Sequence, residues 1–420
     1  MATLSTSDMT RKEVLLAELA AHVPNPPTRV VAPASDPALA KLNALGTSCW
    51  LDTGNLEEAS SLWRAENSAL TTNNTLANQV VQSGIMDEDI KEAVKRIKEL
   101  EPGITEDDLV LDVVFVVNCH IALRLVNAFG VKVSVELHPA VAHDIEKTVR
   151  YAERYFAINP EHFIVKIPMT PEGFCAVARA RARRIPINFT LGFSARQNYL
   201  AALLASPDFV NVFLGRLNAV VSDNQFGDGK NVGEKVTLAS QRVVRELRES
   251  NHAIHTRQIA ASMRSGEQMV SLAGVDVFTI PPKALREFND QKHNPDTLVS
   301  HVGENYPVAL ANGVDRSWVE RLWEVDDNFK KMARELADQG ATNLTGYDLR
   351  QADHHHRTRL FSHFTPEEQV AIRTDGKIPV AAKWLNRAEL DDLMTESALQ
   401  SFIVDQNAFD ARIRQLIASI

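Results

Sequence analysis

A lysine inside an apolar run is the residue of this sequence whose type and surroundings best suit covalent chemistry. Lys166 lies in the segment 163–168, which predicts a short strand followed by a turn and a helix. Because side chains alternate along a strand, Lys166 and Ile164 share one face. A buried ammonium is costly unless it is paired or neutral, and burial lowers the pKa of a lysine, which leaves a free amine able to attack a carbonyl. An edge strand whose lysine reaches solvent is the alternative for this stretch alone.

Further polar residues stand at the ends of other predicted strands, where a buried strand would ordinarily carry apolar ones. In chain order they are Asp52, Thr72, Asn73, Glu136, Asn188, Thr190, Arg216, Ser262 and Arg264. Taken singly they have structural explanations, such as a helix cap for Asp52, a surface ion pair for Glu136 or a turn-satisfying amide for Asn188. Together they predict one site, because the mouth of a barrel gathers the carboxyl ends of its strands.

The chemistry that this set could perform is carbon–carbon bond cleavage through an imine. A neutral lysine attacks a ketone and forms a protonated imine, which withdraws electrons from the neighbouring bond. Cleavage needs a carboxylate that takes a hydroxyl proton, and imine formation needs a second acid or base. Asp52 and Glu136 supply two carboxylates. Two arginines and a serine near the last strands suit a phosphate group, which barrels often bind at that end.

Eight short apolar runs alternate with amphipathic helices, which is typical of a parallel α/β fold. The predicted strands are 48–51, 69–72, 132–137, 163–167, 187–191, 210–214, 255–261 and 275–280. The predicted helices among them are 57–66, 74–100, 105–129, 142–156, 171–183, 194–205, 232–248 and 265–273. Eight such units over about 250 residues favour a (β/α)8 TIM barrel. A doubly wound open sheet is the alternative, but it would usually carry a Gly-rich turn after its first strand, and Asp52-Thr53-Gly54-Asn55 is not one.

We predict four regions in the chain. They are an N-terminal helix (10–22) and linker over 1–41, the barrel over 42–290, a mainly helical extension over 291–390, and a C-terminal helix packed on the barrel over 391–420. In the extension, one helix from Asp315 to Gly340 carries a narrow apolar stripe. Packing of this helix on the barrel is favoured over a coiled-coil homodimer, since a heptad pattern needs more repeats, but the homodimer stays open.

The composition is that of an ordinary soluble globular protein. The chain has 420 residues, of which 45% are hydrophobic and 24% charged, and its net charge of -9 argues against a general nucleic-acid or anionic-membrane binder. The N-terminus has no apolar signal core, and the most apolar run, 109–117, contains Asp112 and is too short to span a bilayer. Cys49, Cys119 and Cys175 show neither a disulfide framework nor zinc spacing, so we expect a reducing cytoplasm.

The order of these motifs along the chain resembles that of the transaldolase family, within the class I aldolases. The matching segments are Asp52-Thr53-Gly54, Thr71-Thr72-Asn73, Val135-Glu136, Val165-Lys166-Ile167-Pro168 with Glu172-Gly173, Asn188-Phe189-Thr190-Leu191 with Phe193-Ser194, Phe213-Leu214-Gly215-Arg216, Ala261-Ser262-Met263-Arg264, Thr279-Ile280-Pro281-Pro282 and Phe402-Ile403-Val404-Asp405-Gln406. The resemblance covers residues 42–288 and the last thirty or so. The segment between looks like an insertion. The combined pattern is specific, whereas each piece alone is weak.

The resemblance implies roles for these residues in a cofactor-free reaction that needs no metal. Lys166 would form the Schiff base, Asp52 would take the C4-hydroxyl proton, and Glu136 and Thr190 would hold the water that shuttles protons. The implied substrate-binding residues are Thr72, Asn73, Asn188, Asn211 and Phe213, with Arg216, Ser262 and Arg264 for the sugar phosphate. Phe213 resembles the aromatic residue of true transaldolases, whereas a tyrosine there is associated with simple aldolases. The expected partners are phosphorylated sugars, in a pentose-phosphate type of metabolism.

The chain departs from the family pattern at three positions. Asn74 stands where Pro is usual, His138 where Asp is frequent, and Asn211 where a Ser that contacts the dihydroxyacetone unit is common. The mechanism is unaffected, and the donor and acceptor sugars stay open. Two other functions are therefore kept: a transaldolase-like aldolase or transferase for an unusual sugar, and a non-catalytic scaffold that binds sugar phosphates.

Overall fold

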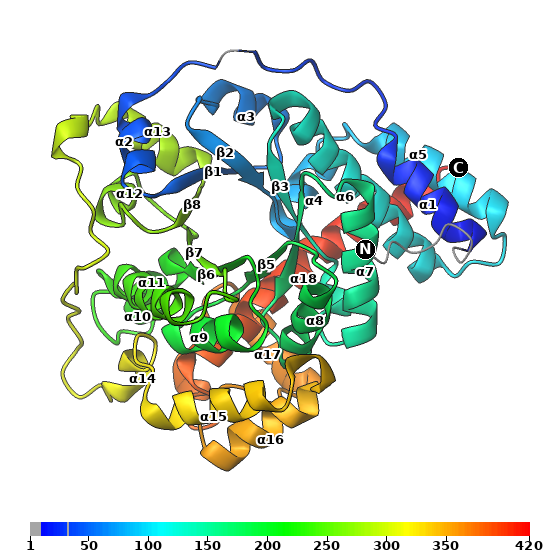
Figure 1. Ribbon diagram of the computed structural model, residues 1–420. Helices are drawn as coiled ribbons and strands as arrows, with labels where there is room; N and C mark the ends of the chain where they lie inside the picture. The colour runs from blue at the N-terminus through cyan, green and yellow to red at the C-terminus, as the bar shows by residue number, and fades with distance from the viewer. Residues whose placement is uncertain (1–9, 32) are drawn as a thin grey trace.

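A closed barrel of eight parallel strands forms the centre of the computed structural model, which describes residues 10–31 and 33–420 (Figure 1). The strands follow one another around the barrel in chain order. They are β1 Ser48–Asp52, β2 Asn67–Thr71, β3 Lys132–Glu136, β4 Phe163–Pro168, β5 Ile187–Thr190, β6 Phe209–Phe213, β7 Arg257–Ala261 and β8 Val277–Ile280. The predicted (β/α)8 barrel is confirmed, and every predicted strand is present. The open-sheet alternative is wrong, because β1 pairs with β8 and closes the sheet.

Helices surround the barrel, and most of them lie in the positions that the sequence pattern indicates. They are α2 Pro37–Ala44, α3 Leu56–Leu62, α4 Asn74–Gln82, α5 Asp87–Leu100, α6 Glu106–Phe129, α7 Ile145–Ile158, α8 Pro171–Ala182, α9 Ala195–Leu204, α10 Leu214–Asp223, α11 Val232–Ser250, α12 Glu267–Ser271 and α13 Pro282–Asp290. The helix predicted over 74–100 is two helices, because Gly84 turns the chain with φ +81°. Three of these helices were not predicted: α2, which begins in the segment predicted to be a linker, α10, which starts directly at the end of β6 with no turn residues between them, and α13, which follows β8.

The most apolar helix, α6, is a core helix. The run that contains Asp112 extends into 24 helical residues, so the expectation that it is too short to span a bilayer is wrong on length alone. However, 89% of its most apolar window is buried inside the protein, and Asp112 pairs with Lys12 of α1 (Arg11–Ala21) at 2.8 Å. α6 therefore serves as the surface on which the N-terminal helix packs. Residues 1–9, where we expected no signal core, lie outside the described residues.

The helical extension packs on the outside of the barrel. Its helices are α14 Ser317–Glu320, α15 Asp327–Asp338, α16 Gly346–His356 and α17 Pro366–Asp375. The single helix predicted from Asp315 to Gly340 is wrong, since the chain turns after α14 and Asp326 caps a new helix at α15. α15 lies against α9 and α16 against α8, at the bottom of Figure 1, so the apolar residues of α15 face the barrel. The division of the chain into four regions stays a prediction.

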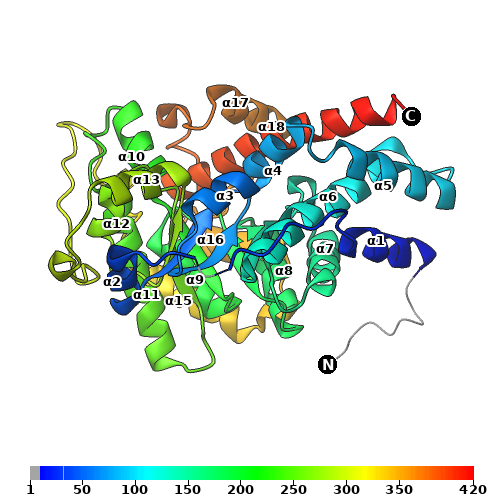
Figure 2. The same cartoon turned by 90° about the horizontal axis from the view of Figure 1, so that it is seen from above.

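The C-terminal helix α18, Leu390–Ile417, crosses the barrel and is held at both ends. Near its start, Arg196 of α9 donates to both carboxylate oxygens of Asp391 at 2.7 Å, and both side chains are buried. Farther along, α18 lies beside α4 and then α5, as the view in Figure 2 shows. Arg412 pairs with Asp87 of α5. The helix is therefore fixed to α9, which follows β5, and to α5, which lies between β2 and β3 in the chain.

Candidate active site

Lys166 lies in the interior of the barrel, in one layer with a carboxylate and an amide. The parallel register places Glu136 of β3 and Asn188 of β5 on either side of it. Its Nζ lies 3.1 Å from Glu136 Oε2 and donates to the carbonyl oxygen of Thr72 at 3.2 Å. Lys166 is 5% exposed and Glu136 is 4% exposed, so both charges are removed from bulk water. The alternative of an edge-strand lysine in solvent is wrong.

Burial sets the proton affinity of the two carboxylates near this amine. Burial raises the pKa of Glu136, although Lys166 opposes the shift. Burial also raises the pKa of Asp52, at the end of β1, from its ordinary value of 3.8 to about 6, against the opposing charges of Lys166 and Arg264. An acid with a pKa near neutrality can both accept and return a proton at physiological pH. The barrel mouth thus holds an amine and two carboxyl groups whose pKa values burial raises.

A row of amides continues the layer toward β6. Asn188 donates from Nδ2 to Ser134 Oγ at 3.1 Å and accepts from Asn211 Nδ2 at 3.3 Å. Asn211 in turn accepts from the backbone N–H of Gly192 at 3.1 Å. A Cβ on Gly192 would lie 2.2 Å from the carbonyl oxygen of Asn211, so this close approach requires glycine. Asn188 and Asn211 are thereby fixed with their amides at the floor of the cavity.

Three predicted site residues take positions that the sequence did not indicate. Thr72 offers its carbonyl to Lys166, whereas its hydroxyl donates to the backbone of Ser134 at 3.1 Å. Asn73 accepts from the N–H of Leu76 at 2.9 Å and so caps α4 while it lines the cavity. Thr190 is completely buried, and its hydroxyl has no hydrogen-bond partner within the part of the chain that is described.

The residues that were predicted to bind the phosphate line another part of the same cavity. Arg216, in the first turn of α10, is 6% exposed and donates to Ser401 Oγ of α18 at 3.0 Å, with its guanidinium 5.9 Å from the ring of Phe402. Burial and the nearby Arg264 lower the pKa of Arg216 to about 10. A Cβ on Gly215 would meet the carbonyl oxygen of Ser262 at 2.2 Å, which explains why glycine precedes this arginine. Two neighbouring guanidinium groups have the charge and the donors to bind a doubly charged anion.

These residues line one cavity of about 450 Å³. Of the predicted set, it is lined by Asp52, Asn73, Lys166, Asn188, Asn211, Phe213, Arg216, Ser262 and Arg264, whereas Thr72, Glu136 and Thr190 lie behind its wall. The sequence interpretation did not include Glu58, Thr75, Gln79, Thr279, Lys283, Arg286, Lys377 and Phe402, which also line it. Thr279 and Phe402 belong to segments that we matched to the family and so could have been found. Lys377 belongs to the extension, where no signal pointed to the site.

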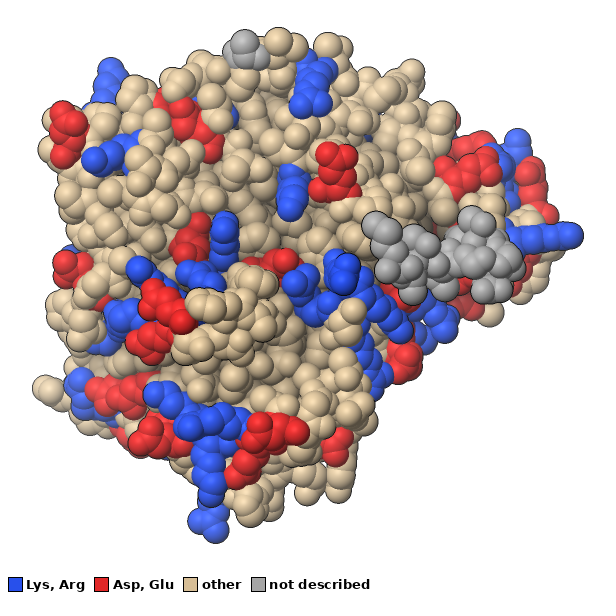
Figure 3. All heavy atoms as spheres, viewed as in Figure 1, with Lys and Arg blue, Asp and Glu red and all other residues tan. Residues whose placement is uncertain are grey.

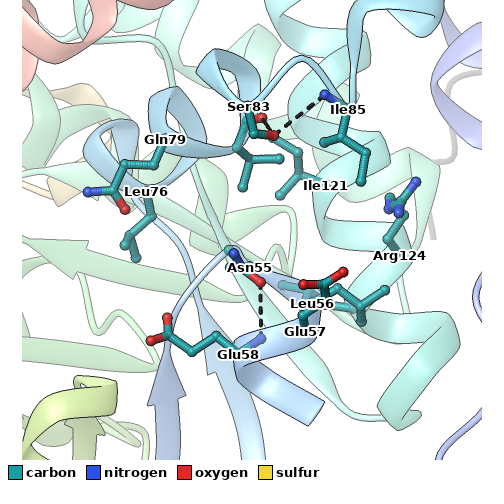
Figure 4. Close-up of a pocket in the computed structure, with 13 residues that line it drawn as sticks. Asn55, Leu56, Glu57, Glu58, Leu76, Gln79, Ser83, Ile85, Ile121 and Arg124 are labelled. Atoms are coloured by element: carbon teal, nitrogen blue, oxygen red, sulfur yellow. Dashed lines mark hydrogen bonds between the residues drawn. The ribbon is translucent and has the colours of Figure 1, made fainter. Parts of the chain in front are cut away.

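A second cavity of about 440 Å³ lies next to the first, between α3, α4 and α6 (Figure 4). Its walls combine apolar side chains such as Ile85 and Ile121 with Glu57 and Arg124. The two cavities share Glu58, Leu76 and Gln79, so α3 and α4 separate them by one layer of side chains. On the face seen in Figure 3, basic and acidic side chains of the described residues lie interspersed.

Comparison with known proteins identifies the family to which the barrel is similar. The family model described as transaldolase/fructose-6-phosphate aldolase matches residues 49–345. This match extends beyond residue 288, where the first part of the resemblance ended, but it does not include the last thirty or so residues. A probable transaldolase of Aquifex aeolicus is 31% identical over 242 residues, which cover 57% of this chain and 87% of the relative. One of Dictyostelium discoideum is 27% identical over 273 residues, 61% of this chain and 81% of the relative. One of Kosmotoga olearia is 37% identical over 149 residues, 35% of this chain and 61% of the relative.

Proposed function

Because this chain belongs to the transaldolase/fructose-6-phosphate aldolase family, we propose that it is a transaldolase that works through an imine on Lys166. It would transfer a dihydroxyacetone unit from a ketose phosphate to an aldose phosphate. The observation that carries this proposal is the buried Lys166 Nζ at 3.1 Å from Glu136 Oε2, at the floor of a cavity that Asp52 also lines. An amine, two carboxyl groups and a cationic end are the parts that such a transfer needs.

The first step would form the imine and release water. The ammonium of Lys166 passes a proton to Glu136, whose raised pKa lowers the cost of that transfer. The free amine attacks the C2 carbonyl of the ketose, and the carbonyl oxygen leaves as water after it has taken two protons through the acid–base groups. Asn188 and Asn211 donate and accept hydrogen bonds in this layer, which supports a role in holding the hydroxyl groups of the three-carbon unit.

The second step would break the C3–C4 bond. Asp52 removes the C4-hydroxyl proton, the C3–C4 electron pair moves into the imine to give an enamine, and an aldose phosphate leaves. The Asp52 carboxyl group, with a pKa of about 6, is ionised at neutral pH. After it has taken the proton, it can return it when the enamine attacks the acceptor aldehyde. Hydrolysis of the new imine then frees Lys166. Arg216, Ser262 and Arg264 would hold the phosphate of donor and acceptor in turn.

Borohydride trapping tests this mechanism directly. With a ketose phosphate present, reduction should fix a dihydroxyacetone-derived group on Lys166, which peptide mass analysis will locate. Lys132, an exposed lysine on the neighbouring strand, should stay unmodified, and the Lys132→Met variant should be trapped as well as the wild type. An unmodified Lys166 in an enzyme that turns over its substrate would reject the imine.

A simple aldolase is the second candidate, because the family model covers both activities. Phe213 favours transfer over simple cleavage, because it resembles the aromatic residue of true transaldolases, whereas simple aldolases are associated with a tyrosine at that position. Buried beside Phe193, its ring covers one wall of the cavity with apolar surface. The two functions separate in one assay: a transaldolase releases aldose phosphate rapidly only when an acceptor aldehyde is present, whereas an aldolase releases free dihydroxyacetone without one.

A further inference from the structure

Lys377 lies in the cavity although it comes from the helical extension. It follows α17 in the chain and lies outside the residues 49–345 that the family model matches. Among the residues that line the cavity, only Lys377 and Phe402 come from beyond α13. We propose that Lys377 is a substrate-binding residue whose ammonium contacts the phosphate held by Arg216 and Arg264. This inference rests on the proposed sugar-phosphate substrate and gives the extension a part in recognising it.

The turn that carries Lys377 is fixed to the same helix that carries Arg216. Gly376, which ends α17, has φ +90°, a backbone conformation that favours glycine. Just beyond Lys377, the side chain of Asn224 donates to the carbonyl of Pro379 at 3.0 Å and accepts from the N–H of Ala381 at 2.8 Å. Asn224 is the residue that follows α10, whose first turn holds Arg216. The position of Lys377 is therefore tied to that of Arg216 by one short helix.

A second set of contacts, within the loop itself, also fixes the turn that carries Lys377. Asp375 accepts from the N–H of Val380 at 3.1 Å and pairs with Lys383 at 2.6 Å, which closes the loop on itself. Pro379 is buried, and Ile378 packs against the hydrophobic core. Lys377 is exposed and lies between these anchored positions. The loop is thus held in place on both sides of Lys377, which is one of the residues that line the cavity.

The cations in the mouth divide into paired and unpaired groups. Arg286 pairs with Glu58 at 2.9 Å, and Lys283 lies 3.7 Å from Glu287. Arg216, Arg264 and Lys377 have no carboxylate within 4 Å in the described chain, and Nη1 of Arg216 is buried there without a hydrogen-bond partner. Three unpaired cations in one cavity repel each other and become favourable when an anion enters. A phosphate monoester carries about two negative charges at neutral pH and three acceptor oxygens, which matches three donors.

Titration with inorganic phosphate tests this role without any need for turnover. At low salt, Lys377→Gln should weaken phosphate binding by about fivefold, the size expected for an exposed ion pair. Lys331→Gln is the matched control, because Lys331 is an exposed lysine on α15 of the same extension and does not line the cavity. It should leave the Kd unchanged, and Lys377→Arg should retain most of the affinity. The difference between Lys377→Gln and wild type should shrink as salt is added.

Kinetics provide the second measurement. Lys377→Gln should raise KM for a phosphorylated ketose by a similar factor, leave kcat within twofold, and leave the KM for the unphosphorylated ketose unchanged. Equal phosphate affinity in Lys377→Gln and wild type would overturn the proposal, as would an equal loss in Lys331→Gln. Because phosphate binding does not involve the imine, a protein that binds phosphate through Lys377 but is not trapped by borohydride would disprove the proposed reaction and leave this inference standing.

Discussion

The two ends of the cavity are built in different ways. At the reactive end, Glu136, Lys166 and Asn188 come from adjacent strands in register and are almost completely buried, and Lys166 pairs with Glu136. At the anion end, Arg216 and Arg264 come from helix starts and loops. Their neighbours Ser401 and Lys377 lie more than a hundred residues away in the chain. The reactive end depends on the alternation of side chains along strands, and the anion end depends on tertiary contacts.

This difference implies different sensitivities to substitution. A change at the reactive end removes a participant in bond making, whereas a change at the anion end weakens the hold on a group that does not react. We therefore expect the former to lower kcat by large factors and the latter to raise KM by smaller ones. The predictions below test this contrast, beginning with the largest effect.

Replacement of Lys166 by Met should lower kcat by at least about 10⁴-fold, the order seen when a covalent nucleophile is removed. Methionine keeps most of the volume of the side chain, so the barrel interior should remain packed. Steady-state assays with a ketose phosphate and an acceptor aldehyde measure the loss, and circular dichroism checks the fold. Activity within tenfold of wild type in a folded variant would contradict a covalent role for this amine.

Asp52→Asn should lower kcat by about 10³-fold, within the range for a positioned general base. The same change should stabilise the protein. Burial raises the pKa of Asp52 from 3.8 to about 6, so the unfolded chain ionises first and stability falls as the pH rises between these values. Removal of that cost should add about 1 to 3 kcal/mol to the free energy of unfolding at pH 7. Denaturant-induced unfolding of wild type and Asp52→Asn measures this difference in the free energy of unfolding, which should vanish near pH 3.

The strand-borne part of the fold and site could be predicted from the sequence, because alternation and spacing are local properties. Lys166 in an apolar run and Asn188 two residues from Thr190 already indicated buried faces. The hydroxyl of Thr72 could not be placed in this way, since its direction depends on the backbone of β3. Nor could Lys377, which is brought to the mouth by hydrogen bonds to Asn224, 153 positions earlier in the chain.

Arg216→Ala should raise KM for a phosphorylated donor by about 10- to 100-fold, the equivalent of one charge-assisted hydrogen bond. kcat should fall much less, because the guanidinium lies away from the reacting carbon. An unphosphorylated ketose serves as the control substrate, and its kcat/KM should be nearly the same in both proteins. If Arg216→Ala lowered kcat as much as Asp52→Asn does, the two ends of the cavity would not be separate in function.

The pH dependence of the wild type should report the carboxylate at the reactive end. Because the ionised form of Asp52 is the base, kcat/KM should fall as the pH drops below about 6 and reach about a tenth of its plateau at pH 5. The residual activity of Asp52→Asn should lack this acid limb. If kcat/KM of Asp52→Asn falls below about pH 6 in the same way as in the wild type, the acid limb belongs to the titration of another group.

The smallest effect on activity is expected at Asn74 and His138, two of the departures from the family pattern, which contact α18 through its side chains. Asn74 donates to Gln406 Oε1 at 2.9 Å, Gln406 donates to Asp410 Oδ1 at 2.8 Å, and the other oxygen of Asp410 lies 3.3 Å from His138 Nε2. These contacts join the ends of β2 and β3 to the C-terminal helix that also contacts Arg216.

A double-mutant cycle with Asn74→Ala and Gln406→Ala tests whether this network supports the anion end or only the fold. Each single change should lower the free energy of unfolding by about 1 to 2 kcal/mol, because each leaves a buried polar group without its partner. The double variant should lose less than the sum, with a coupling of about 1 kcal/mol. If α18 positions Arg216 through this network, KM for the phosphorylated donor should rise two- to threefold with kcat unchanged. A lower kcat and an unaltered KM would instead mean that the network supports the reactive end, through the strands that carry Glu136 and Thr71.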